Sequence, residues 1–97
     1  MVLCGGWSDV KEANDTIHGI VSQLKNELQE KTGRQFDQLT ALQFRSQIVC
    51  GTNYLIKVKV SDDEHIHVRA HLPLRSETPS YVDHKDKLSA AHDLETF

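Results

Sequence analysis

Hydrophobic and polar residues follow a helical rhythm in the first third of the chain. Between Asn14 and Lys31 the apolar residues recur on one stripe, namely Ile17, Ile20, Val21, Leu24 and Leu28. This spacing matches the 3.6-residue turn and predicts an amphipathic helix. Asn14 or Asp15 can cap its start, and Gly33 can supply a left-handed stop. Because so apolar a stripe needs cover, we expect it to lie against a sheet.

The rhythm then changes to alternation. Leu42–Ile48, Tyr54–Val60 and Ile66–Leu72 alternate mainly apolar with polar residues, and Leu55 is an apolar residue in the polar phase. Alternation of this kind predicts antiparallel strands with one face on the core and one face in water. On the first strand Leu42, Phe44 and Ile48 share one parity. A change of phase near Thr40 indicates a β-bulge or bend there.

The remaining segments are less regular. Pro73 must end or bend the third strand, because it cannot donate a hydrogen bond to a ladder. A short edge strand is weakly marked around Tyr81–Val82, and Leu88, Leu94 and Phe97 are expected to pack back on the domain. A helix followed by antiparallel strands predicts a single α+β domain over residues 1–97. We expect one N-terminal α-helix packed across a twisted, four- to five-stranded antiparallel β-sheet.

Composition narrows the classes of function. The chain has 97 residues, of which 38% are apolar and 26% charged, with a net charge of −3. This balance is typical of a globular protein and disfavours nucleic acid as a partner, because binding phosphates needs a basic stripe. No apolar run reaches membrane length, and the first residues do not resemble an export signal. We therefore expect a cytoplasmic protein in which Cys4 and Cys50 are free thiols.

Two kinds of site chemistry are considered and disfavoured. A cysteine nucleophile needs a base beside it, and the spacing places no histidine next to Cys4 or Cys50, so we do not expect an enzyme. His65 and His67 share a strand face and lie close enough to chelate zinc, with His71 further along. Since a third ligand is not evident, we expect a solvated strand face beside Lys57 and Lys59. No metal or cofactor is predicted.

The unusual stretch is the turn between the first two strands. Gln47-Ile48-Val49-Cys50-Gly51 is apolar where hairpin turns are normally polar, and exposed apolar side chains indicate a docking surface. Antiparallel strands bring Leu72-Pro73 to the same end of the sheet. Residues 1–8 read as an extended arm, which contributes Leu3 and Cys4 before the flexible pair Gly5 and Gly6.

These residues resemble a known family. Gln47 to Gly51 resembles the Gln-Val-Val-Ala-Gly signature of cystatins, with Cys50 where the family usually has alanine. The following Thr52-Asn53-Tyr54-Leu55-Ile56-Lys57-Val58 is similar to the strand after the signature in stefins, the intracellular type 1 cystatins. The resemblance extends to the Cys-Gly-Gly start, to Leu28-Gln29-Glu30-Lys31 and to Phe97.

The resemblance implies a reversible, tight-binding, competitive inhibitor of papain-like cysteine proteases such as cathepsins. The family's wedge would correspond here to the arm ending at Gly5, with Leu3 and Cys4, to the loop Gln47–Gly51, with Ile48, Val49 and Cys50, and to Leu72-Pro73. We expect a monomer and leave open a domain-swapped dimer through the long hairpin around residue 50. The alternative function is a cystatin-like protein-binding module that does not inhibit.

Overall fold

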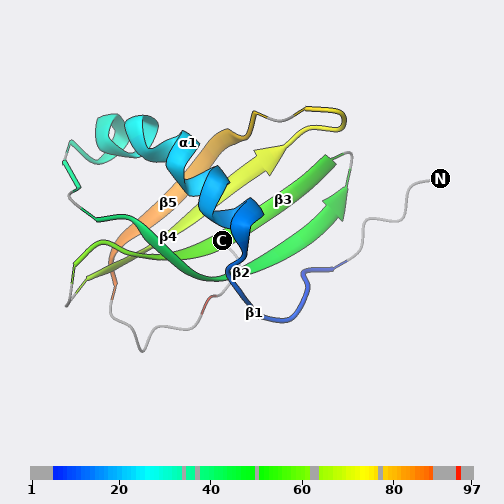
Figure 1. Ribbon diagram of the computed structural model, residues 1–97, viewed down its shortest axis with the longest axis horizontal. Coiled ribbons are helices and arrows are strands. Elements are labelled where there is room, and N and C mark those ends of the chain that lie inside the picture. Colours follow the sequence, from blue (N-terminus) through cyan, green and yellow to red (C-terminus); the bar gives the residue numbers. More distant parts are fainter. Residues whose placement is uncertain are drawn as a thin grey trace.

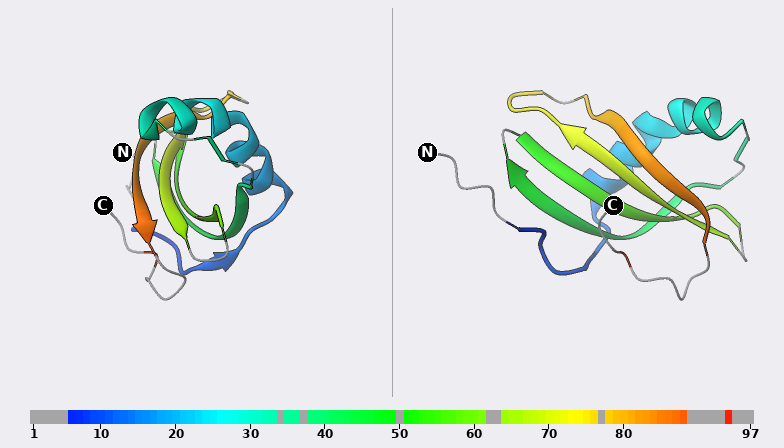
Figure 2. Two further views of the ribbon diagram at one scale, coloured as in Figure 1. Left: turned by 90° about the vertical axis from the view of Figure 1, so that its left-hand side faces the viewer. Right: turned by 180° about the vertical axis from the view of Figure 1, so that it is seen from behind.

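The computed structural model describes residues 6–33, 35–36, 38–49, 51–61, 64–76, 78–88 and 94. One helix, α1 (Asp15–Thr32), lies across a five-stranded antiparallel sheet (Figure 1). The strands are β1 (Lys11–Glu12), β2 (Thr40–Val49), β3 (Gly51–Lys59), β4 (His65–Leu72) and β5 (Ser80–Leu88). They lie side by side in chain order, and the sheet curls around the helix (Figure 2). The predicted α+β fold is confirmed.

The helix begins and ends where the sequence indicated. Asn14 is the N-cap, and its side-chain oxygen accepts a hydrogen bond from Ile17 N at 3.0 Å. Gly33 closes the helix in the left-handed conformation at φ 68°, which glycine adopts without steric cost. The predicted apolar stripe is buried and packs against the inward side chains of β2, β3 and β4.

The bulge on β2 corrects one predicted orientation. The register with β3 shifts between Ala41 and Gln43, close to the position predicted near Thr40. Because the bulge adds a residue, Ala41 and Phe44 both face the core and Leu42 is turned outward. The prediction that Leu42 lies on the same face as Phe44 is therefore wrong.

The alternation predicted a second face of the sheet exposed to water, but the central part of this face is buried. Leu55 and Leu94 are 0% and 4% exposed, yet they lie outside the cluster between helix and sheet. Arg45 Nη1 donates to Leu94 O at 3.2 Å, which places the Leu94 backbone against this face. Lys57, His65 and His67 are buried here as well. The prediction that Leu94 packs back on the domain is confirmed, whereas Phe97 lies outside the described residues.

Candidate functional site

The two hairpin ends predicted to lie together do so. Val49 and Gly51 are the last register pair of the β2–β3 hairpin, and Thr52 pairs with Leu72 of β4. The β2–β3 hairpin and the β4–β5 connection therefore occupy the same end of the molecule (Figure 1). We call this end the hairpin edge and define it by residues 47–49, 51 and 72–76.

Gly51 sets how closely the two parts of the edge approach. Its φ is 96°, a conformation that L side chains rarely adopt. A Cβ atom on Gly51 would lie 2.4 Å from Leu72 O and 3.0 Å from Pro73 Cα. Both of those atoms belong to the backbone, so the approach depends on glycine at this position.

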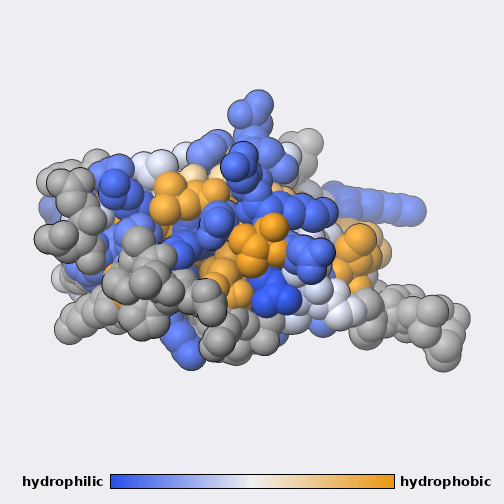
Figure 3. All heavy atoms as spheres, turned by 90° about the horizontal axis from the view of Figure 1, so that it is seen from below, coloured by the Kyte–Doolittle hydropathy of each residue, from blue (hydrophilic) through white to orange (hydrophobic). Residues whose placement is uncertain are grey.

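The hairpin edge presents apolar side chains to solvent. Ile48 is 71% exposed, and Leu74 is 70% exposed on the adjoining connection. Residues 73–76 form a turn in which Ser76 N donates to Pro73 O at 3.2 Å. Arg75 in this turn has a positive φ of 59°. On the face drawn in Figure 3, apolar side chains emerge in separate groups among polar ones.

The end of the arm is anchored beside β2. Ser8 N donates to Ser46 O at 2.8 Å, and Ser46 N donates back to Ser8 Oγ at 3.0 Å. Arg45 Nε also donates to Ser8 O at 2.8 Å, and the Arg69 guanidinium lies 5.9 Å from the centre of the Trp7 ring. Ser46 is one residue from Gln47, so the chain enters the fold next to the hairpin edge.

The predicted site residues divide into two groups. The structure brings together the backbones of Gln47–Val49, Gly51 and Leu72–Pro73 at one edge. Leu3, Cys4, Gly5 and Cys50 lie outside the described residues, so their part in the site stays a prediction. The sequence did not predict Leu74, Asn53 and His71 as site residues. Asn53 could have been found, because counting the register from a turn at residue 50 places it opposite Gln47.

The histidines considered for zinc are paired but not solvated. His65 stands opposite Lys59, and His67 stands opposite Lys57. Burial lowers the pKa of His65 below its usual value, and the nearby Lys57 and Lys59 charges lower this pKa further. The same positive potential opposes a bound cation. Within the described residues, no three histidine, cysteine or acidic side chains gather around a point where a metal ion could bind.

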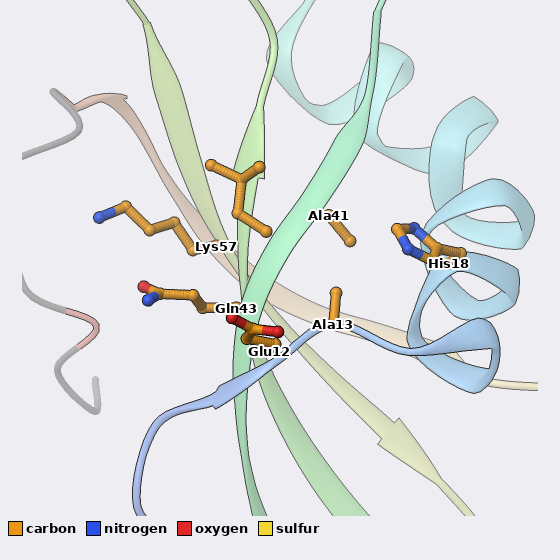
Figure 4. Close-up of a pocket in the computed structure, with 7 residues that line it drawn as sticks. Glu12, Ala13, His18, Ala41, Gln43 and Lys57 are labelled. Carbon is orange, nitrogen blue, oxygen red and sulfur yellow. The ribbon is translucent and has the colours of Figure 1, made fainter.

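A hollow lies away from the hairpin edge. It has a volume of about 470 Å³ beside the β2 bulge and is lined by Glu12, Ala13, His18, Ala41, Leu42, Gln43 and Lys57. Figure 4 shows His18 on one side of β2 and Lys57 with Gln43 on the other. The polar groups labelled there do not converge, so this hollow has no features of a binding site.

Known proteins resemble this chain over most of its length. A family model for the cystatin domain matches residues 5–89. Stefin-C of Bos taurus is 46% identical over 65 residues, which cover 67% of this chain and 64%, a little under two thirds, of that protein. Cystatin-A of Homo sapiens is 37% identical over 81 residues, 84% of this chain and 83% of that protein. Cystatin-B of Pan troglodytes is 35% identical over 97 residues, 99% of both chains.

Proposed function

Because the chain belongs to the cystatin family and is of the stefin type, we propose that it inhibits papain-like cysteine proteases of the cathepsin kind. Family membership supports inhibition of cysteine proteases in general. The proposal adds that binding is reversible, tight and competitive, and that the hairpin edge enters the active-site cleft. A cytoplasmic location and a monomeric state, expected from the sequence, stay proposals.

One observation carries this proposal. The backbone of Gly51 touches that of Leu72 and Pro73, so two connections form one narrow edge with Ile48 and Leu74 exposed on it. A narrow apolar edge suits a cleft, because the cleft removes its side chains from water. The strands that flank both connections are held by regular β-pairing. Little conformational freedom is then lost on binding, which favours affinity.

The proposed wedge has three parts. The first hairpin, with Ile48, Val49 and Cys50, would bury its apolar side chains against the cleft wall. Leu72-Pro73 would contact the cleft beside it. Leu3 and Cys4 would lie extended in substrate-like subsites, and Gly5 would let the chain turn away from the catalytic cysteine. Without a near-attack geometry, cleavage of the bound chain is slow. The inhibitor acts by occupying the active-site cleft and needs no catalytic group of its own.

The test is a titration of papain with the purified protein at fixed substrate. We expect full and reversible loss of activity, with an apparent inhibition constant that rises with substrate concentration. Ile48→Asp should weaken inhibition at least about tenfold, since the complex would bury an unpaired charge. Val82→Asp is the matched control, because Val82 is 47% exposed on β5, outside the proposed wedge.

The two variants separate the possible outcomes. Unchanged papain activity in excess protein would sink the proposal and leave the non-inhibitory binding module. Inhibition that is equally strong in wild type and Ile48→Asp would keep the inhibitor but remove the hairpin edge as its contact surface.

A further inference from the structure

A chain of polar side chains crosses three strands directly behind the first hairpin turn. Gln47 of β2 stands opposite Asn53 of β3, and Asn53 stands opposite His71 of β4. Residues paired in this way project from the same face of a sheet. Asn53 Nδ2 donates to Gln47 Oε1 at 3.2 Å, and His71 Nδ1 lies 2.7 Å from Asn53 Oδ1.

The order of donors and acceptors fixes the direction of this chain. The amide oxygen of Asn53 carries no hydrogen, so His71 Nδ1 must hold the proton and donate it. Hydrogen bonds then run from His71 to Asn53 and from Asn53 to Gln47. A histidine protonated on Nδ1 donates in this way as the neutral tautomer and as the imidazolium.

His71 also lies under the turn itself. Its Cε1 atom is 3.2 Å from the place that a Cβ atom on Gly51 would occupy. One imidazole thus packs against the tightest point of the first hairpin and at the same time orients Asn53. His71 immediately precedes Leu72 in the chain, so it ties the first hairpin to the start of the second connection.

We propose that His71 is a positioning residue of the inhibitor, an inference that rests on the proposed function. Through Asn53 it holds Gln47 and locks the two parts of the hairpin edge at a fixed spacing. Hairpin ends in water open locally at small free-energy cost, because few buried contacts hold them. A lock made before binding reduces the ordering that the protease must impose, and affinity rises accordingly. His71 itself need not touch the protease.

The experiment compares two substitutions at residue 71 in the full chain. His71→Phe keeps a planar ring but removes the donor. His71→Asn places an amide N–H as many bonds from Cα as Nδ1 is, and so restores the donor. Since one neutral hydrogen bond is worth roughly 0.5–1.5 kcal/mol, H71F should raise the papain inhibition constant about 3- to 10-fold. H71N should stay within about twofold of wild type on the same reasoning.

The melting temperature of each variant is the second readout. Inhibition is measured far below that temperature, where a variant that is only less stable is still folded and has an unchanged inhibition constant. His18→Phe and His18→Asn are the matched controls, because His18 is exposed on α1 and belongs to no part of the network. Neither control should change inhibition.

A double-mutant cycle with Asn53→Ala completes the test. Removing the middle of the network should weaken inhibition to the same degree as H71F, and the two changes together should cost little more than either alone. If H71F fails to fold, N53A alone still tests whether the network supports inhibition.

The outcomes are distinct from those of the proposed function. Wild-type protein that leaves papain active overturns the proposed function. Wild-type inhibition matched by H71F or N53A overturns the positioning role. A loss in H71F that H71N does not restore, or additive losses in the cycle, overturns the hydrogen-bond lock in particular.

Discussion

Gly51 is the residue where backbone geometry and proposed function meet most closely. Gly51→Ala would add a Cβ atom 2.4 Å from Leu72 O, at a φ of 96° that alanine resists. We expect a loss of about 1–3 kcal/mol in the free energy of unfolding, because the backbone must shift or stay strained. Inhibition should weaken more than this loss of stability explains, since the spacing of the hairpin edge changes. Chemical denaturation and a papain titration measure the two effects.

Gly19 provides the matched control for this prediction. It lies within α1, and no atom stands within 4 Å of the Cβ position that alanine would fill. Gly19→Ala should therefore raise the free energy of unfolding by about 0.5–1 kcal/mol, through helix propensity, with no change in inhibition. If the two glycine variants shifted stability in the same direction, the special geometry at Gly51 would be refuted.

Among the elements, those with strong periodicity could be predicted from the sequence. The helix and the three central strands have repeating apolar positions, and both helix caps have residues whose chemistry is specific to caps. β5 was expected only as a short strand around Tyr81–Val82, yet it extends over Ser80–Leu88. Its residues are mostly polar, so pairing with β4, and not local propensity, makes it a strand.

The candidate site was predictable to the extent that it is local in sequence. The apolar turn at residues 47–51 can be recognised by its composition, and Leu72-Pro73 follows from strand direction. The Gln47–Asn53–His71 network needs the exact register of three strands, which alternation alone does not give. The covering of the second face could not be predicted either. It includes Leu94, which lies far along the chain from Arg45 of β2, the residue that binds its backbone.

The covered face gives a prediction at the scale of elements. Leu94→Ala should lower the free energy of unfolding by about 2–4 kcal/mol, because a buried leucine is replaced by a cavity. Val82→Ala, at a position that is 47% exposed, should cost less than about 0.5 kcal/mol. Urea denaturation followed by circular dichroism measures both. A loss at Leu94 no larger than at Val82 would contradict the packing of this residue on the sheet.

For the molecule as a whole, the second face predicts sensitivity to acid. Burial, with Lys57 and Lys59 nearby, holds the pKa of His65 below its value of 6.5 in an unfolded chain. The unfolded state therefore takes up a proton more readily than the folded state. The contribution of His65 to stability is complete above pH 6.5 and declines as the pH falls from there toward the lowered pKa.

Denaturation of wild type and His65→Leu at a series of pH values between 7 and 5 checks this expectation. The fall in stability on acidification should be smaller in His65→Leu, which has no proton to gain at this position. His18→Gln is the control for the loss of a histidine away from this face, on the exposed side of α1. Parallel pH curves for wild type and His65→Leu would show that His65 does not carry the effect.

The strand order has a consequence for how the chain reaches its fold. In the described part of the chain every strand pairs only with its neighbours in sequence, and the connections after β2, β3 and β4 are short. Ends of short connections meet at low entropic cost, so the central sheet can grow one hairpin at a time. The proposed inhibitory edge is made from two of these connections. A refolding chain can therefore assemble that edge before Leu94 packs against the sheet.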